Sequence, residues 1–262
     1  MKKFVSIVLA LIMLVLPVSA GAVTDLEYEW YVTLSNIPYI DDFETYVAPN
    51  DMDPNNPETM WAAFAVNTGV MSVDENGNFR PNECVTRAET AAILDKLPFY
   101  DPSDDLGPIW LYGDVQKSAW YYDCVSNQGG YISGSTPNGL NMYFHPDANI
   151  EKGDFVVGLY LRLRNADPKD YWLDAFQSYD ELYDFAGDFQ DANEIDALAC
   201  YSEIPYRFAY NQFIFDGIIK PYNGDDVVKL NTHGPITRLE VARMITRVYN
   251  KFHYWLYTPG HW

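Results

Sequence analysis

A helix-start motif recurs in this chain, and the recurrence constrains the fold more than any other feature of the sequence. Its clear copies are VTRAE at 85–89 and ITRLE at 236–240, and a weaker copy, IEKGD, lies between them at 150–154. In the clear copies a threonine is followed three residues later by a glutamate, the pattern of a capping box at a helix N-terminus. The capping pairs predicted in this way are Thr86 with Glu89 and Thr237 with Glu240. Three ordered copies predict a repeat architecture.

The segments around the motif also repeat when Arg87, Lys152 and Arg238 are superimposed. Apolar residues follow four and seven positions later in every copy, at the spacing of one helix face. These residues are Ala91, Val156, Ala242, Leu94, Leu159 and Ile245. The apolar residues two positions before the basic residue are Val85, Ile150 and Ile236. Each copy also follows a glycine-containing turn and an aromatic-rich stretch, so we predict one unit of helix, turn loop and capped helix, present three times.

The first residues have the features of an exported protein. Residues 1–22 combine Lys2 and Lys3 with an apolar core and small residues near Ala20 and Ala22, which predicts a secretory signal peptide. No later stretch is long and apolar enough to cross a bilayer. Removing residues 1–22 changes the formal charge from −20 to −22, because two of the 17 basic residues are lost and all 37 acidic residues remain. Such acidity argues against nucleic acid as a partner.

No arrangement of residues predicts catalysis, a cofactor or a metal ion. The four histidines are scattered, and the nucleophile elbow, phosphate loop and zinc-protease motifs are absent. DENGNF at 74–79 partly resembles a calcium loop but lacks the terminal glutamate, so a turn is favoured. Cys84, Cys124 and Cys200 lack metal-ligand spacing, and one disulfide or buried free thiols are both open. We therefore expect a protein that is not an enzyme.

The repeated unit resembles that of the S-layer homology (SLH) family, whose repeats run from a Phe–x–Asp–Val start to a Thr–Arg–Ala–Glu helix. The second copy fits closely, with Asp114 and Val115 in YGDV, Trp120 six residues after Asp114, and FHPDANI at 144–150. The other matching segments are 69–97, YISG at 131–134, FQD at 189–191, GII at 217–219 and ITRLE at 236–240. The resemblance covers roughly residues 57 to 250, and the first copy lacks the Phe–x–Asp–Val start.

This resemblance implies a fold and a function. The fold is mainly all-α, a three-fold pseudo-symmetric helical bundle or prism of three helix–loop–helix repeats, with ligand grooves between them. SLH repeats bind secondary cell-wall polymers whose terminal sugar carries a pyruvate ketal. We therefore expect a secreted, non-covalent cell-wall anchor in the surface layer of a Gram-positive-type bacterium. Its expected partner is a pyruvylated secondary cell-wall polysaccharide on peptidoglycan, with other surface proteins as further candidates.

A basic residue at the first helical position is the part of the motif that suggests binding. A cation there opposes the helix dipole, but beside free backbone N–H groups it makes a small site for an anion. The resemblance implies that Arg87, Lys152 and Arg238 bind the ketal carboxylate. The residues that it implies as sugar contacts, or as points of close backbone approach, are Asp114, Trp120, Asp191, Tyr206 and Gly134.

Departures from the family pattern lead us to expect one or two working grooves. Lys152 cannot form the bidentate fork of an arginine. Tyr206 stands where the third repeat would have a tryptophan, and Trp61 lies about one turn late, so we expect Trp61 in the core. For Trp120 a core position and a sugar contact are equally open, because large aromatic side chains are mostly buried.

The expected organisation follows from the repeats and the segments between them. A lead-in segment precedes the repeats, and an Asp- and aromatic-rich insertion with the spacing of an amphipathic helix separates the second repeat from the third. The expected boundaries are 1–22 for the signal peptide, 23–56 for the lead-in, 57–100, 110–164 and 189–250 for the repeats, 165–188 for the insertion and 251–262 for an aromatic tail.

Two interpretations from different classes remain open. In the first, the chain anchors a protein by binding an anionic glycan. In the second, degenerate repeats serve as a non-catalytic scaffold that contacts other proteins. The state of the arginines separates them, because anchoring needs Arg87 or Arg238 open in a groove beside an aromatic residue. The scaffold interpretation predicts that both arginines are paired with internal acids.

Overall fold

The computed structural model describes most of the three segments that the sequence predicts to be repeats. The described residues are 47–97, 112–128, 131–132, 134–135, 142–165, 189, 191–196, 206–219 and 230–257. The predicted signal peptide, most of the lead-in, the insertion after Asn165, Cys200 and the end of the tail lie outside them.

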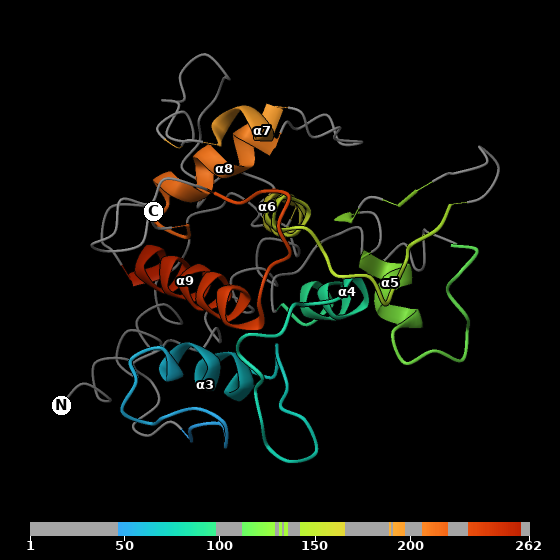
Figure 1. The fold of residues 1–262 in the computed structure, drawn as a ribbon. Coiled ribbons are helices and arrows are strands. Elements are labelled where there is room, and N and C mark those ends of the chain that lie inside the picture. The colour runs from blue at the N-terminus through green and yellow to red at the C-terminus, as the bar shows by residue number, and fades with distance from the viewer. Residues whose placement is uncertain are drawn as a thin grey trace, which may run out of the picture.

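The described part of the chain is helical (Figure 1). Its helices are α3 (Thr59–Asn67), α4 (Arg87–Asp95), α5 (Tyr122–Gln128), α6 (Lys152–Asn165), α7 (Ala192–Asp196), α8 (Tyr206–Phe215) and α9 (Arg238–Tyr257). Extended pairing among the described residues is limited to isolated bridges, such as that between Cys84 and Thr237. The prediction of a mainly all-α fold is confirmed.

Helix α9 shows why these segments are helical and how they pack. Its buried residues Val241, Ile245, Val248 and Tyr249 recur at three- and four-residue spacing, which makes one apolar stripe along the helix. Tyr249 of this stripe meets Phe64 of α3 edge-to-face at 5.4 Å, and the two helices lie side by side (Figure 1). Helix α9 continues to Tyr257, so the first residues of the expected tail are part of this helix.

The remaining helices pack in pairs around a shared apolar core. Helix α4 contacts α5 and α6, while α8 contacts α6 and α7. Several aromatic side chains of this core are almost fully buried. The largest of them are Phe64, Phe79, Phe144, Phe155, Phe213, Tyr210 and Tyr249. Trp61 packs against this core, as expected, and Arg247 of α9 lies over its ring at 5.6 Å.

Three residues that the sequence aligns with one another meet at the centre of the molecule. The N–H of Val85 donates to the carbonyl of Ile236 at 3.0 Å, that of Ile236 to Ile150 at 3.4 Å, and that of Ile150 to Val85 at 3.0 Å. Each of the three side chains is fully buried. The three hydrogen bonds form a closed ring, here called the central ring, which joins segments separated by up to 151 positions in the chain.

The helices that follow the central ring are docked by their first N–H groups onto neighbouring loops. The N–H of Arg87 donates to Ala148 at 2.9 Å, and that of Ala88 donates to Pro146 at 3.0 Å. The equivalent donors Lys152, Gly153, Arg238 and Leu239 bond to Gly234, Thr232, Glu83 and Pro81. These helix N-termini are therefore satisfied within the protein, which corrects the expectation of free N–H groups beside the basic residues.

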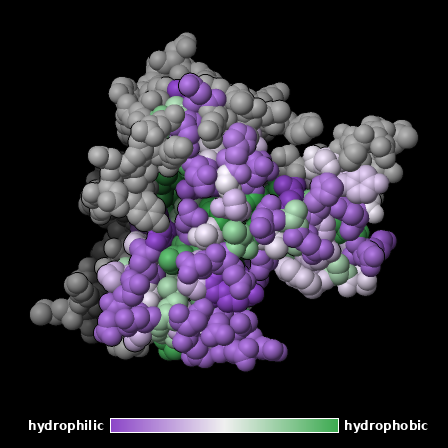
Figure 2. All heavy atoms as spheres, viewed as in Figure 1, coloured by the Kyte–Doolittle hydropathy of each residue, from purple (hydrophilic) through white to green (hydrophobic). Residues whose placement is uncertain are grey.

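The described surface is largely hydrophilic on the face shown in Figure 2, where apolar atoms form small separate areas. Among the helices that the structure describes, none has both the length and the apolar character that a membrane-crossing helix needs.

Candidate functional site

The two TRxE helices begin as capping boxes. Thr86 accepts the N–H of Glu89 at 3.1 Å, and the Thr86 N–H donates to the Glu89 carboxylate at 2.9 Å. Helix α9 has the same reciprocal pair between Thr237 and Glu240. At the start of α6 the preceding residue is Glu151, whose carboxylate instead contacts His233 at 3.2 Å.

The basic residue that opens each of these helices pairs with an acid on another helix. In each case the acid lies two positions after the basic residue of its own motif, at the third helical position. The three pairs are Arg87 with Asp154 at 3.5 Å, Lys152 with Glu240 at 3.2 Å, and Arg238 with Glu89 at 3.3 Å. Helix α4 thus pairs with α6, α6 with α9, and α9 with α4, a closed arrangement that we call the ion-pair ring.

Arg238 is enclosed by further contacts. Its Nε donates to the carbonyl of Phe79 at 2.6 Å, and its Nη2 donates to the carbonyl of Ser72 at 2.6 Å. The guanidinium lies over the Phe79 ring at 4.9 Å, and only 5% of the residue is exposed. All three guanidinium nitrogens therefore contact acceptors within the protein, counting the pair with Glu89.

Arg87 has a closely similar environment. Its Nε donates to the carbonyl of Phe144 at 2.6 Å, its guanidinium lies over the Phe144 ring at 5.1 Å, and 8% of the residue is exposed. The expectation of an arginine open in a groove is therefore not met at Arg87 or at Arg238. The observed pairing with internal acids is the one that the scaffold interpretation predicts.

Burial shifts both members of the Arg87–Asp154 pair towards their neutral forms. Desolvation lowers the pKa of Arg87, although the attraction of Asp154 opposes the shift. Desolvation also raises the pKa of Asp154, against the opposing effects of Tyr206 and Arg87. Burying these charges thus costs more than their mutual attraction recovers. Glu240 differs, because Lys152 and the capping bonds of Thr237 together outweigh desolvation and lower its pKa.

The aspartates at the starts of the repeats hold the turn loops. Asp114 accepts the N–H groups of Phe144 and His145 at 2.8 and 2.7 Å. Asp191, only 4% exposed, accepts those of Leu230 and Asn231, both at 2.7 Å. Both oxygens of each carboxylate are used in this way, so the structure gives these two predicted sugar contacts an internal role.

Asp51 does the same for the turn loop at 74–80, and sequence analysis missed it. Its carboxylate accepts the N–H groups of Phe79 and Arg80 at 2.8 and 2.7 Å. The missed signal is an aspartate followed by an apolar residue, since Met52 follows Asp51 as Val115 follows Asp114. The second residue of each clamped pair has a positive φ; these residues are Arg80, His145 and Asn231, at 60°, 57° and 54°.

Two other predicted site residues also make internal contacts. Tyr206 is buried and its hydroxyl donates to Asp154, the partner of Arg87. Gly134 leaves room for an aromatic side chain, because a Cβ atom there would lie 2.8 Å from Cε1 of Tyr112. Asp154 was not singled out from the sequence, although it occupies the motif position of Glu89.

Trp120 is the predicted residue that the structure leaves accessible. Its side chain is 67% exposed, and its ring meets that of Tyr121 edge-to-face at 5.3 Å. This settles the question left open by the sequence in favour of a surface position.

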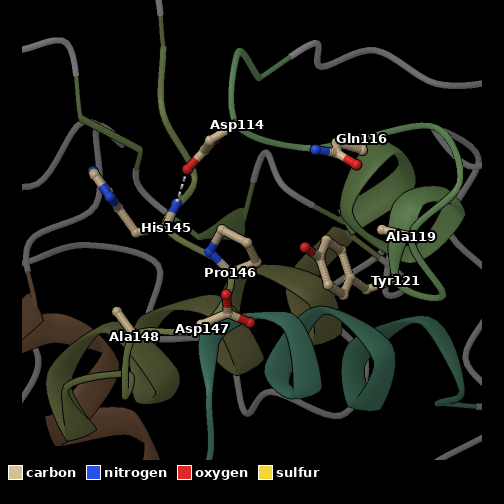
Figure 3. A pocket seen from close by; sticks show the side chains of 8 residues that line it. All are labelled: Asp114, Gln116, Ala119, Tyr121, His145, Pro146, Asp147 and Ala148. Atoms are coloured by element: carbon tan, nitrogen blue, oxygen red, sulfur yellow. Dashed lines mark hydrogen bonds between the residues drawn. The ribbon is translucent and has the colours of Figure 1, made fainter.

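A pocket of about 550 Å³ lies beside Tyr121, and Trp120 lies in the chain between two of its lining residues, Ala119 and Tyr121. Its lining residues are Asp114, Gln116, Ala119, Tyr121, His145, Pro146, Asp147 and Ala148. In Figure 3 the Tyr121 hydroxyl is directed towards Pro146 and Asp147, while the His145 imidazole is turned away. That imidazole bonds the hydroxyl of Ser135 at 2.6 Å. The pocket therefore offers amide, hydroxyl and carboxylate groups.

The pocket adjoins the start of α4. Pro146 and Ala148 in its wall accept the first two N–H groups of that helix, and Asp114 lies close enough to Arg87 to influence its pKa. Arg87 therefore lies behind the pocket wall, with Asp154 as its partner inside the protein.

The described residues contain no group of three or more metal-ligating side chains arranged to hold an ion. Cys84 and Cys124 are free thiols, and burial raises the pKa of Cys124 to about 11, which keeps this thiol protonated at neutral pH.

Comparison with known proteins finds a domain match in the segment that contains Arg87. A family model of the S-layer homology domain matches residues 62–91, which contain most of α3, the first turn loop and the start of α4. The surface-layer 125 kDa protein of Lysinibacillus sphaericus is 27% identical over 185 residues, covering 70% of this chain. The chain spans 13% of the length of that relative. Residues 62–91 therefore match an S-layer homology domain, and this stretch includes the capped start of α4 with Arg87 as its first residue.

Proposed function

We propose that this protein attaches non-covalently to the bacterial cell surface by binding a secondary cell-wall polysaccharide at the pocket beside Trp120. The observation that carries the proposal is this exposed aromatic residue next to a polar pocket, in a chain that contains an S-layer homology domain. The name of the relative, a surface-layer protein, supports the same location. The protein acts as a non-catalytic anchor on a wall of the Gram-positive type.

The pocket has the chemical groups that a sugar ring needs. A pyranose presents an apolar face that stacks on an aromatic ring, and its hydroxyl groups form hydrogen bonds with polar side chains. Trp120 supplies the aromatic face, while Gln116 and Tyr121 supply hydrogen-bonding groups. The carboxylate of a pyruvylated terminal sugar would pair with Arg87 behind the wall, which requires rearrangement of the Arg87–Asp154 pair.

We further propose that the three aligned segments are copies of one unit around an approximate three-fold axis. The central ring and the ion-pair ring support this proposal, because each contains one equivalent member from every segment. The working groove lies where the start of the second unit, with Trp120, meets Arg87 of the first unit. At the start of the third unit the equivalent basic residue is Lys152 of the second unit, which pairs with Glu240, and the buried Tyr206 stands in place of the exposed tryptophan.

Retention on cell walls tests the proposal. Purified protein is mixed with Gram-positive walls that contain or lack their secondary polymer, and bound protein is quantified. We expect retention only with the polymer, and a loss of about tenfold in affinity for Trp120→Ala, equivalent to about 1.4 kcal/mol. Met60→Ala is the matched control, since Met60 is also an exposed apolar residue but lies on α3. Equal retention with and without polymer would overturn the proposal.

The scaffold interpretation is the second candidate, favoured by the internal pairing of Arg87 and Arg238. It predicts that a surface protein retains the chain. Treating the walls with protease before the assay separates the two candidates. Retention that survives the protease but requires the polymer supports the anchor, whereas retention lost on protease treatment supports the scaffold.

A further inference from the structure

The Arg87–Asp154 pair differs from the other two members of the ion-pair ring. Glu89 and Glu240 each bond with one oxygen to the N–H of their own capping threonine and with the other to the cation. Asp154 has no capping threonine before it, since Glu151 stands there. Its carboxylate is bound instead by the Tyr206 hydroxyl from α8 and by Arg87. Both of these partners of the Asp154 carboxylate therefore belong to other helices.

The separation of the pair is also the longest in the ring, at 3.5 Å against 3.2 and 3.3 Å. The charged and titratable groups that face Asp154 are Arg87 from α4, Tyr206 from α8, Glu151 ahead of α6 and His233 from the loop before α9. Burial raises the pKa of this carboxyl group, although Tyr206 and Arg87 oppose the shift. A proton is thus taken up here more readily than on an ordinary aspartate.

The long separation of the Arg87–Asp154 pair matters for binding because of where the pair lies. Arg87 lies behind the wall of the Trp120 pocket, and an incoming carboxylate would need the guanidinium that Asp154 now contacts. Two carboxylates competing for one guanidinium repel each other, and the like charges destabilise the occupied state. Neutralising Asp154 removes that competition.

We propose that Asp154 is a built-in competitor for Arg87, which sets the affinity of the pocket for an anionic sugar and strengthens binding in acid. This inference rests on the proposed glycan-binding function. Above its titration range Asp154 is ionised and holds Arg87 within the protein. Below that range the protonated acid still contacts Tyr206 but no longer supplies an anion to Arg87. Asp154 is then a specificity-determining residue that does not itself need to contact the ligand.

Isothermal titration with a matched pair of sugars tests the inference. The probes are a methyl hexopyranoside carrying a pyruvate ketal and the same glycoside without the ketal. For the wild type we expect the ketal sugar to bind more tightly at about pH 4.5 than at about pH 7, and the plain glycoside to show no such change. Asp154→Asn should bind the ketal sugar about tenfold more tightly at about pH 7 and lose the pH dependence.

Two control variants separate Asp154 from its neighbours. Glu240→Gln neutralises the equivalent acid of the Lys152 pair and should leave ketal-sugar binding at the Trp120 pocket unchanged. His233→Asn removes the imidazole near Asp154, and the pH dependence of ketal-sugar binding by this variant should match the wild type. Circular dichroism at both pH values establishes that each variant is folded.

The outcomes distinguish this inference from the function on which it rests. If the wild type binds the ketal sugar but Asp154→Asn binds no more tightly, or keeps the pH dependence, the competitor role is wrong and the anchor stands. If the pH dependence disappears in His233→Asn, the competitor role is also wrong. If neither probe binds the wild type or Asp154→Asn, and walls do not retain the protein, the glycan-binding function fails and this inference fails with it.

Discussion

Arg238 on the first turn of α9 pairs with Glu89 on the first turn of α4, at 3.3 Å and across 149 positions of sequence. A cation at a helix N-terminus opposes the helix dipole, and by itself would destabilise α9 slightly. Glu89 compensates for this from the neighbouring helix while it also caps α4. One carboxylate therefore serves two helix starts, and the motif joins units as well as beginning helices.

Removing Arg238 should destabilise the fold strongly. Arg238→Ala leaves the carbonyls of Phe79 and Ser72 without this donor and Glu89 without its cation, so we expect the free energy of unfolding to fall by about 3–5 kcal/mol. Arg80→Ala is the control, because Arg80 forms an exposed pair with Glu83 and should change stability by no more than about 0.5 kcal/mol. Urea denaturation measures both. If Arg238→Ala and Arg80→Ala both lower the free energy of unfolding by a similarly small amount, the buried contacts of Arg238 contribute little.

Asp51 should be required for the first repeat although it precedes the expected boundary at residue 57. Asp51→Asn replaces an acceptor of two backbone N–H groups with an amide whose NH₂ cannot accept, and we expect a loss of about 1–2 kcal/mol. Asp191→Asn should cost more, because Asp191 is buried and Asp51 is exposed. Thermal unfolding of Asp51→Asn and Asp191→Asn shows which variant loses more stability. Glu75→Gln, in an exposed loop, is the neutral reference, and an Asp51→Asn variant as stable as Glu75→Gln would contradict the clamp.

The capping box of α9 should make stability dependent on pH. The pKa of Glu240 is lowered in the folded protein from its usual 4.5, so its carboxylate stabilises the fold above that pH, and this contribution is lost as pH falls through the lower folded value. Glu240→Gln should therefore reduce the free energy of unfolding by about 1–2 kcal/mol near neutral pH.

Chemical denaturation of Glu240→Gln and the wild type from neutral to acidic pH measures this effect. The two stability curves should converge in acid, because the wild-type carboxylate is then protonated as well. A difference that stays constant with pH would show that the substitution destabilises the fold through packing and that the charge of Glu240 is irrelevant.

Gly158 should be intolerant of a side chain although it lies within a helix. Alanine normally stabilises a helix interior by about 1 kcal/mol relative to glycine. At this site a Cβ atom would lie 2.9 Å from the Tyr131 carbonyl oxygen and 3.6 Å from Leu94, so α6 would have to move away from its neighbours. We expect a net loss of about 1–3 kcal/mol for Gly158→Ala in thermal unfolding. A gain in stability would mean that the loop carrying Tyr131 yields easily.

The helices and their starts could be predicted because their signals are local. Capping pairs, apolar spacing and glycine turns all act within a few residues, and the alignment on Arg87, Lys152 and Arg238 identified which residues occupy equivalent places. The alignment also placed Val85, Ile150 and Ile236 at equivalent positions. Their hydrogen bonds to one another follow only from the assembled structure.

The partners of the basic residues could not be predicted, because they depend on which helix start lies next to which. Arg87 has Glu89 two residues away in sequence, yet it pairs with Asp154 on another helix. Trp120 was undecided for the same reason, since an aromatic residue at that spacing fits the core as well as the surface. Asp51 was missed because the search required a Phe–x–Asp–Val start, whereas the physical requirement is a carboxylate that reaches two N–H groups of the turn.

The central ring also sets the order in which this domain can be completed. Two of its three members are synthesised before residue 151, but the Val85 N–H has no acceptor in the ring until Ile236 arrives. A chain that leaves the ribosome, or crosses a membrane, from its N-terminus therefore has an open ring for most of that passage. The central ring therefore closes only when Ile236 is in place, after almost all of the described residues that precede α9.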